Sequence, residues 1–305
     1  MLDVCLLGTG GMMPLPGRFL TSLMLRYHGI SILIDCGEGT QIALRKKGWS
    51  PNPIDIICFT HYHADHISGL PGMLLTMGNA QRSEPLLMIG PKGLEKVVNS
   101  LRVIAPGLPF EIRFTELSEA TERFFFDGFS LDAFKVNHNV VCYGYRMNVE
   151  RAGLFDTTKA IQNGIAQKFW NKLQKGETIT FEDRTFTPDM VLGPKRKGLQ
   201  VTYSTDTRPT QSILDYATDV DLLILEGMYA DQAMLDKAKE RKHMTMVEAA
   251  HTAVSARPKE LWLTHYSPSF VAPQMQGKMI KKIFPNTVIA MDGQSAELKF
   301  SDEES

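Results

Sequence analysis

The sequence predicts a layered α/β protein, and three features of the chain indicate this class. Short apolar runs typical of strands alternate with helical stretches along the 305 residues. Hydrophobic residues make up 43% and charged residues 22%, which are ordinary globular values and exclude a disordered, collagen-like or rod-like chain. Residue types that carry chemistry stand directly after several apolar runs. Mixed strands and helices with such groups at strand ends are typical of a sheet protein covered by helices.

The expected elements follow from these apolar runs and from the turns between them. A glycine-rich turn follows the first strand, and His28-Gly29 closes a hairpin between the next two. The fourth strand is continuously apolar, as expected of a strand covered on both faces. Helices are expected from Gly69 onward and over Gly93–Val103, Asp231–Arg241 and Val247–Arg257. The expected strands are Val4–Leu7, Leu23–Arg26, Ile30–Ile34, Ile54–Thr60, Leu86–Gly90, Glu111–Leu117, Phe124–Phe126, Ser130–Val136, Tyr143–Asn148, Leu199–Ser204, Leu222–Glu226, Leu261–His265 and Thr287–Met291.

The length allows two domains of roughly 150 residues, or one large α/β domain with an insertion. Residues 149–198 are polar and rich in turns, whereas strong strands stand before and after them. We therefore expect a single domain over residues 1–305 with an inserted arm at residues 149–198.

Composition also limits the location and the partners of the protein. The formal net charge is −1, which argues against a uniformly basic nucleic-acid binder but allows a local basic patch. No apolar run approaches the 18 or so residues of a membrane span, and the acidic N-terminus lacks the features of a signal peptide. The four cysteines are far apart, in apolar runs, and are expected to be buried free thiols. We therefore expect a cytoplasmic protein without a membrane partner.

The strongest chemical signal is the segment Thr60–His66 directly after the fourth predicted strand. It holds His61, His63, Asp65 and His66, so that three imidazoles and a carboxylate lie within six residues. One short turn can direct these groups at a single point, and neutral imidazole is the commonest protein ligand of zinc. The segment therefore predicts a metal site.

One loop cannot fill two metal coordination spheres, so further ligands are sought after other strands. His138, Asp206 and His265 each stand at or just beyond the end of an apolar strand. Each alone is commonly a polar residue at the edge of a core. Together they repeat one pattern, which favours a shared metal centre.

These residues, in this order, resemble the metallo-β-lactamase superfamily. The wider set of motifs is similar to the short-form ribonuclease Z group, enzymes that trim the 3′ end of precursor tRNA. The resemblance spans nearly the whole chain. Besides the metal residues, the motifs that carry it are Leu7-Gly8-Thr9-Gly10, Leu33-Ile34-Asp35-Cys36-Gly37-Glu38-Gly39-Thr40-Gln41, Gly69-Leu70-Pro71-Gly72, Tyr143-Gly144-Tyr145-Arg146, Asp206-Thr207-Arg208, His243-Met244-Thr245 and Leu263-Thr264-His265-Tyr266-Ser267.

The resemblance implies an αββα sandwich of two mixed β-sheets with outer helices, the metallo-β-lactamase fold. It also implies two zinc ions per chain, although histidine and carboxylate sites accept manganese or iron as well. Two metals close together can activate water at neutral pH and clamp the attacking and leaving oxygens of a phosphodiester. By resemblance one ion is held by His61, His63 and His138, the other by Asp65, His66 and His265, and Asp206 bridges them.

The resemblance further implies the catalytic groups. Asp65 is expected to accept the proton of the nucleophilic water. His243 is expected to protonate the leaving 3′-oxygen or to bind the phosphate in the transition state. Glu226 closes an apolar strand and is expected to orient His243; a surface acid that caps a helix is the alternative for this residue.

The segment from Leu154 to Lys197 holds eight bases and five acids, a net charge of +3. A basic arm of this kind, with Phe169 and Trp170, can grip an RNA backbone by charge and shape. A solvated surface arm or a dimer contact is the alternative, but the resemblance implies a tRNA-binding arm here. The expected RNA-binding residues are Lys168, Lys172, Lys175, Lys195, Arg196 and Lys197.

We therefore predict a dizinc endoribonuclease that cuts precursor tRNA at its 3′ side and leaves a 3′-hydroxyl. The resemblance implies a homodimer in which one subunit's arm holds the tRNA that the other subunit cuts. The first alternative is a related dizinc hydrolase that acts on a small phosphodiester, a cyclic nucleotide or a lactone. The second is a non-catalytic RNA-binding protein of the same fold.

Overall fold

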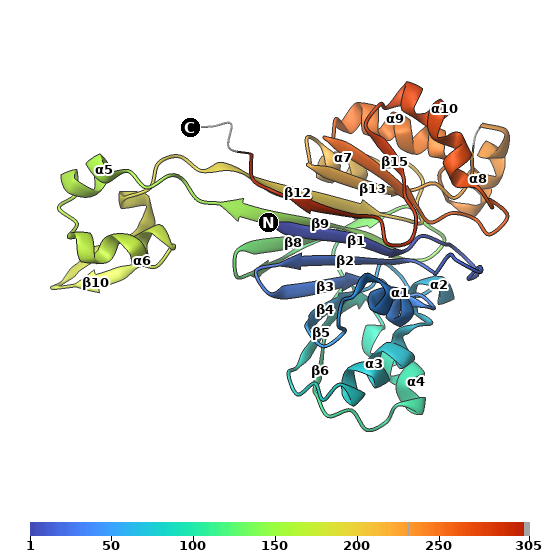
Figure 1. Ribbon diagram of the computed structural model, residues 1–305, viewed down its shortest axis with the longest axis horizontal. Coiled ribbons are helices and arrows are strands. Elements are labelled where there is room, and N and C mark those ends of the chain that lie inside the picture. The colour runs from blue at the N-terminus through green and yellow to red at the C-terminus, as the bar shows by residue number, and fades with distance from the viewer. Residues whose placement is uncertain (231, 302–305) are drawn as a thin grey trace. The chain divides into compact units, whose positions relative to one another are not determined.

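Most of the strands form two mixed β-sheets (Figure 1). The computed structural model describes residues 1–230 and 232–301, and within these ranges each sheet has seven strands. Sheet I has the order β16-β1-β2-β3-β4-β5-β6, and sheet II has the order β15-β14-β13-β12-β9-β8-β7. The strands of sheet I are β1 (Leu2–Gly8), β2 (Ser22–Tyr27), β3 (Ile30–Ile34), β4 (Ile54–Cys58), β5 (Leu86–Pro91), β6 (Ile112–Leu117) and β16 (Ser295–Leu298). Those of sheet II are β7 (Thr121–Phe126), β8 (Phe129–Val136), β9 (Cys142–Arg151), β12 (Arg196–Ser204), β13 (Leu222–Glu226), β14 (Glu260–Thr264) and β15 (Thr287–Ile289).

Helices cover the outer face of each sheet, which gives the predicted αββα sandwich (Figure 1). One core cluster joins sheet I to residues of α1, α3 and α4, and a second joins sheet II to α7, α9 and α10. The helices are α1 (Thr40–Lys47), α2 (Ala64–Ile67), α3 (Leu70–Asn79), α4 (Leu94–Leu101), α7 (Gln211–Ala217), α8 (Leu235–Arg241), α9 (Met246–Ala256) and α10 (Gly277–Ile283). No helix in the described ranges has the length and apolar character to cross a bilayer.

Most predicted elements are present with small shifts at their ends. The apolar run at Ile54–Thr60 leaves the sheet at Cys58, and the strand expected to reach His265 ends at Thr264. The helix predicted from Asp231 is a 3₁₀ turn at Gln232–Met234 followed by α8, and Asp231 itself lies outside the described residues. The elements of the two sheets and their covering helices that were not predicted include α1, α7, α10 and β16.

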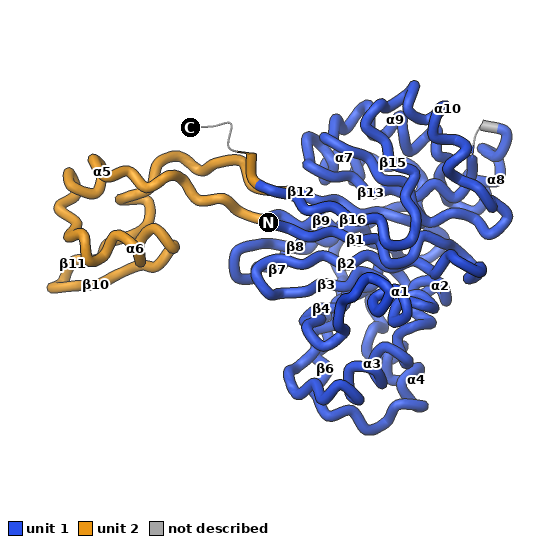
Figure 2. Tube along the Cα trace, viewed as in Figure 1, with its two compact units in different colours: residues 1–148, 200–299 blue, residues 149–199, 300–305 orange. Residues whose placement is uncertain are grey.

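The chain divides into two compact units (Figure 2). Unit 1 combines Met1–Asn148 with Gln200–Lys299, and unit 2 contains Val149–Leu199 and the described residues after Lys299. Unit 2 has its own small core, formed by Ala160, Ile165, Leu173, Phe186 and Val191. Its regular elements are α5 (Thr157–Gln162), α6 (Trp170–Gln174) and the hairpin β10 (Ile179–Phe181) with β11 (Arg184–Phe186). Its description as an arm inserted into a single domain stays a proposal.

The four cysteines are buried free thiols, as predicted. Burial raises the pKa of Cys36 to about 12, with a small opposing effect of Thr40. These thiols stay protonated at neutral pH and act as small apolar core residues.

Candidate metal centre

The segment that follows β4 places four of the predicted ligands at the C-terminal end of this strand of sheet I. His61 and His63 lie in the extended turn after the strand, and the single-turn helix α2 carries Asp65 and His66. His61 and His66 are fully buried, and Asp65 is 7% exposed. The turn therefore presents these side chains to the interior of the protein.

The other three predicted ligands come from sheet II. His138 follows β8, Asp206 follows β12 and His265 follows β14. Asp206 and His265 have φ angles of 53° and 56°, in the left-handed region. Non-glycine residues pay for this conformation, and such strain is kept where the surrounding structure holds a functional side chain in place. The two strand ends turn sharply here and direct both side chains inward.

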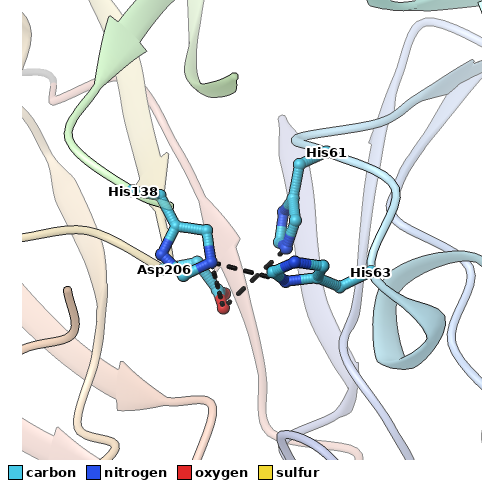
Figure 3. A group of neighbouring side chains, drawn as sticks. All are labelled: His61, His63, His138 and Asp206. Atoms are coloured by element: carbon cyan, nitrogen blue, oxygen red, sulfur yellow. Dashed lines mark hydrogen bonds and ion pairs between the residues drawn. The ribbon is translucent and has the colours of Figure 1, made fainter. Parts of the chain in front are cut away.

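The seven side chains converge into two neighbouring groups. In the first, His61, His63, His138 and Asp206 point toward one another (Figure 3), and their ligand atoms all lie within 4.8 Å. His138 Nε2 is 3.4 Å from His63 Nδ1. Asp206 Oδ1 is 3.9 Å from the Nε2 atoms of both His61 and His138.

Asp65, His66 and His265 form the second group. The Nε2 atoms of His66 and His265 are 3.2 Å apart, and His265 Nε2 is 3.3 Å from Asp65 Oδ2. Asp206 Oδ2 is 3.1 Å from both of these Nε2 atoms. The two oxygens of Asp206 thus face different groups, so this carboxylate lies between them.

These residues fit divalent metal ions. His61 Nε2 is buried and has no hydrogen-bond partner among the described residues. The two facing Nε2 atoms in the second group cannot both donate, and they are arranged like ligands around a common point. Imidazole and carboxylate ligands in a metallo-β-lactamase fold provide for divalent metal binding.

The pKa shifts of the imidazoles and the carboxylates favour the binding of a cation. Burial lowers the pKa of His61, His63 and His138, so these rings are neutral near pH 7 and keep a free lone pair. Burial opposes ionisation of Asp206, but His265 and His66 lower its pKa well below the usual range. Asp65 also has a lowered pKa, because His66 and His265 outweigh its burial. Burial disfavours a charge on His66, yet Asp206, Asp35 and Asp65 raise its pKa well above the usual range. The centre therefore combines ionised carboxylates with three neutral imidazoles and a fourth, His66, that the carboxylates stabilise in its charged form.

Asp35 is a site residue that the sequence argument did not single out, although it lies in one of the motifs. Its fully buried carboxylate accepts hydrogen bonds from His66 Nδ1 at 2.7 Å and from Thr60 N at 2.8 Å. The bond to Nδ1 fixes the tautomer of His66 and leaves Nε2 free for a metal. A buried aspartate one residue past a strand is the signal that could have identified it.

A backbone element of the centre also escaped prediction. The amide of Met12 donates to Asp65 Oδ2 at 2.6 Å, and Met12 has a φ of 66°. The neighbouring Gly11 lies against the ring of His265, where an added Cβ would be 2.8 Å from Cε1. The turn after β1 therefore holds one ligand and packs against another.

His243 and Glu226 form a hydrogen-bonded pair beside the predicted metal ligands. His243 Nδ1 donates to Glu226 Oε2 at 2.9 Å and lies 3.8 Å from Asp206 Oδ1. The other oxygen of Glu226 accepts the amide of Thr207 at 2.6 Å. Burial disfavours a charged imidazole, yet Glu226, with Asp206 and Asp65, raises the pKa of His243 to about 9. Glu226 is fully buried and is not the surface acid considered as its alternative.

The predicted RNA-binding residues belong to unit 2. Lys168, Lys172 and Lys175 are exposed, and the Lys168 ammonium lies 4.2 Å from the ring centre of Phe181. Lys195 pairs with Glu150 at 3.6 Å, Arg196 donates to Ala152 O at 3.0 Å, and Lys197 is exposed. The aromatic residues expected beside them, Phe169 and Trp170, are half-buried against the core of unit 2. Phe169 and Trp170 therefore stabilise unit 2, and the basic side chains provide its exposed positive charge.

Two sequence families match the chain. Residues 2–191 match the family described as "Anti-Pycsar protein Apyc1". Residues 170–266 match the family described as "Beta-lactamase superfamily domain". With the αββα sandwich and the histidine and aspartate centre, this defines the class as a metal-dependent hydrolase of the metallo-β-lactamase superfamily.

Relatives of the same length narrow the class to a family. The ribonuclease Z of Lachnospira eligens is 61% identical over 99% of this chain and 100% of its own. That of Lachnoclostridium phytofermentans is 57% identical and matches all of both chains. The crystal structure of human tRNase Z, short form, superimposes with a TM-score of 0.71 at 25% identity and covers 98% of this chain and all of its own. The chain belongs to the ribonuclease Z family, and its residues 2–191 belong also to the Apyc1 family.

Proposed function

We propose that this protein is a dizinc endoribonuclease that cuts precursor tRNA at its 3′ side and leaves a 3′-hydroxyl on the tRNA. As a member of the ribonuclease Z family the chain is a metal-dependent endoribonuclease. The observation that carries the proposal is the likeness to ribonuclease Z over the full length, with every predicted ligand at one centre. The non-catalytic alternative has no support from these relatives.

We assign one zinc ion to His61, His63 and His138 and a second to Asp65, His66 and His265, with Asp206 shared. The two groups of ligand atoms support this division. Zinc ions at these positions would polarise the phosphodiester and make a water nucleophilic at neutral pH.

Two side chains of the protein are assigned to proton transfer. Asp65, held by the Met12 amide, accepts a proton from the attacking water. His243, charged at neutral pH and held by Glu226, donates a proton to the leaving 3′-oxygen or binds the phosphate. Because Glu226 fixes Nδ1, the Nε2 face of His243 is the one available to substrate.

Unit 2 is assigned to substrate binding. Its exposed bases Lys168, Lys172, Lys175 and Lys197, with Lys195 and Arg196, suit the phosphates of an RNA backbone. In the proposed homodimer, the unit 2 of one subunit would hold the tRNA that the other subunit cuts. We further propose that the enzyme acts in the cytoplasm.

The direct test is cleavage of a 3′-extended precursor tRNA with mapping of both new ends. We expect one cut on the 3′ side of the tRNA and a 3′-hydroxyl on the tRNA product. Asp65→Ala should bind the precursor with an unchanged Kd and cut it at least about 100-fold more slowly, the scale of a lost general base. Cleavage by Asp65→Ala at the wild-type rate would exclude the role assigned to this residue.

Metal content is a separate test. Elemental analysis of the purified protein should give about two zinc ions per chain, as expected of a two-metal site. His138→Ala and His265→Ala should each lose about one of them, since they belong to different groups of ligands. A metal-free protein with full activity would contradict the proposal.

A paired substrate test separates the tRNA proposal from action on a small phosphodiester. Removing residues 154–197 should abolish cleavage of precursor tRNA and spare hydrolysis of a small aryl phosphodiester. Lys168→Ala/Lys172→Ala/Lys175→Ala is the milder variant and should weaken tRNA binding more at low salt than at high salt, because salt screens the phosphate contacts that it removes. Equal tRNA cleavage with and without the segment would show that unit 2 is not the RNA-binding element.

A further inference from the structure

The position of His243 depends on the short connection between α8 and α9. α8 ends at Arg241, Lys242 adopts a φ of 54°, and Thr245 is the N-cap of α9. Glu226 holds the imidazole of His243 at Nδ1, and the amide of His243 donates to Ala238 O at 2.8 Å. The backbone is held by a second contact, in which Arg208 Nη1 donates to the carbonyl oxygen of His243.

Arg208 comes from the strand end that carries Asp206. Its amide donates to Asn137 O at 3.1 Å, next to the ligand His138. Its guanidinium forms a two-point ion pair with Glu248, in which Nη1 lies 3.0 Å from Oε2 and Nη2 contacts Oε1. The side chains of Arg208 and Glu248 are only 15% and 16% exposed, so solvent screens this pair little.

Glu248 in turn fixes the start of α9. Its Oε2 accepts the amide of Thr245 at 3.0 Å, and its own amide donates to Thr245 Oγ1 at 3.1 Å. These reciprocal bonds form a capping box, which sets where the helix begins. Arg208 therefore links the Asp206 strand end to both the carbonyl of His243 and the first turn of α9.

We propose that Arg208 is a positioning residue that sets the distance between His243 and the metal ligands. The inference rests on the proposed role of His243. One planar guanidinium serves two partners at fixed angles, which the single ammonium of a lysine cannot reproduce. Without it, His243 would keep Glu226 and the amide bond to Ala238 but lose the contact at its carbonyl oxygen, on the side that leads into α9. A displacement of about 1 Å in a reacting group can cost about 100-fold in rate.

A cavity beside the pair makes the proposal testable by chemical rescue. It has a volume of about 380 Å³ and is lined by Pro209, Glu248, His251 and Thr252, among others. When Arg208 is shortened to alanine, a free guanidinium ion can enter from this side and pair with Glu248. Rescue of this kind depends on the geometry of the fork and is not expected of a residue that only stabilises the fold.

The experiment measures single-turnover cleavage of a 3′-extended precursor tRNA by Arg208→Ala and Arg208→Lys. We expect both to lower the rate constant about 10- to 100-fold, with unchanged KM, tRNA affinity and zinc content. Millimolar guanidinium, against sodium at the same ionic strength, should accelerate Arg208→Ala several-fold and leave His243→Ala unchanged. Arg257→Ala is the matched control, since Arg257 forms a similar two-point pair with Asp219 at the other end of α9.

Wild-type turnover by Arg208→Ala overturns the inference, and so does a loss of rate that comes with loss of zinc or that guanidinium does not restore. Should Arg208→Ala not fold, Glu248→Gln keeps the fold of the chain closer to native and should show the same change in rate without a change in KM. His243→Ala separates the two proposals. If it turns over at the wild-type rate, the proposed role of His243 fails. If it is inactive while Arg208→Ala turns over at the wild-type rate, only the role of Arg208 fails.

Discussion

Asp35 shows how a single buried side chain can control a metal ligand it does not replace. A carboxylate inside a protein is costly unless its oxygens are satisfied, and here His66 and Thr60 supply the donors. The Thr60 hydroxyl also lies 3.0 Å from Nδ1 of His61. Asp35 and Thr60 together therefore orient one imidazole in each group of ligands.

Asp35→Asn should weaken zinc binding about 10- to 100-fold, the usual effect of removing a partner of a metal-binding histidine. The amide offers the wrong charge to His66 and can present a donor to its Nδ1. Competition with a fluorescent chelator measures the affinity. Asp132→Asn is the control, because Asp132 is equally buried but pairs with Arg123. Equal zinc affinity in both variants would contradict the role of Asp35.

Gly11→Ala tests the close approach of backbone to ligand. The new Cβ would lie 2.8 Å from Cε1 of His265 and 3.0 Å from Cε of Met228, which is closer than side chains tolerate. His265 must therefore move, and we expect loss of about one zinc ion per chain and of most activity. Gly107→Ala should have no effect, since a Cβ there meets no atom within 4 Å. If Gly11→Ala binds the full amount of zinc and is active, the turn after β1 can move to accommodate the added Cβ, and the prediction is wrong.

At the scale of elements, unit 2 is a small fold with a small core. Two short helices and a hairpin pack on five buried residues, with Phe155, Phe169 and Trp170 at the edge. So few contacts leave little stability in reserve, because small cores barely offset the entropy of ordering the chain. Single substitutions in this core are therefore expected to unfold the unit by itself.

Leu173→Ala should cost unit 2 about 2–5 kcal/mol of stability, the usual range for a fully buried leucine. We expect protease cleavage within residues 149–199, a raised KM for precursor tRNA, and unchanged hydrolysis of a small aryl phosphodiester. Ile161→Ala is the control in the same unit, since Ile161 is 64% exposed. Parallel loss of both activities in Leu173→Ala would argue against independent unfolding of unit 2.

At the scale of the whole molecule, the metal centre joins the two sheets. His61, His63, Asp65 and His66 follow a strand of sheet I, and the other three ligands follow strands of sheet II. A bound ion therefore acts as a cross-link between the layers of the sandwich. Because the unfolded chain cannot gather these ligands, binding free energy adds to folding free energy.

Thermal unfolding should for this reason depend on free zinc. A site at 100 times its Kd adds about 2.7 kcal/mol to the free energy of unfolding, so chelation should lower the Tm by several degrees. A titration of zinc back into the chelated protein, followed by calorimetry, measures the effect. Asp206→Ala should reduce the dependence of the Tm on zinc concentration. If the Tm of the wild type does not change with zinc concentration, a bound ion does not cross-link the two sheets.

The ligands were predictable because their chemistry is carried by side chains at recognisable places. Three histidines and an aspartate in one turn, and single polar residues after apolar runs, leave a pattern in the sequence alone. Glu226 and His243 were found through the resemblance. The αββα fold followed from the same resemblance, and the strand order supports it.

The rest of the centre could not be predicted, because the groups involved are not marked by an unusual type of side chain. The Met12 amide and the carbonyl of His243 are backbone groups that every residue has. Asp35 directly follows β3, but the sequence does not show that its carboxylate is buried against His66. β16 spans four residues of mixed polarity and exists because β1 offers it an edge, and α1 carries mostly polar residues over a narrow apolar strip.

The pairing of β1 with β16 also joins two parts of the chain that are made at very different times. Leu2 lies opposite Leu298, so β1 waits during synthesis for a partner that is made almost 300 residues later. Until then β1 is an exposed edge, and edges of this kind invite aggregation. His265 likewise arrives after most of the chain has been made. We therefore expect nascent chains to stay catalytically silent until His265 has been made and to need protection until β16 can pair with β1.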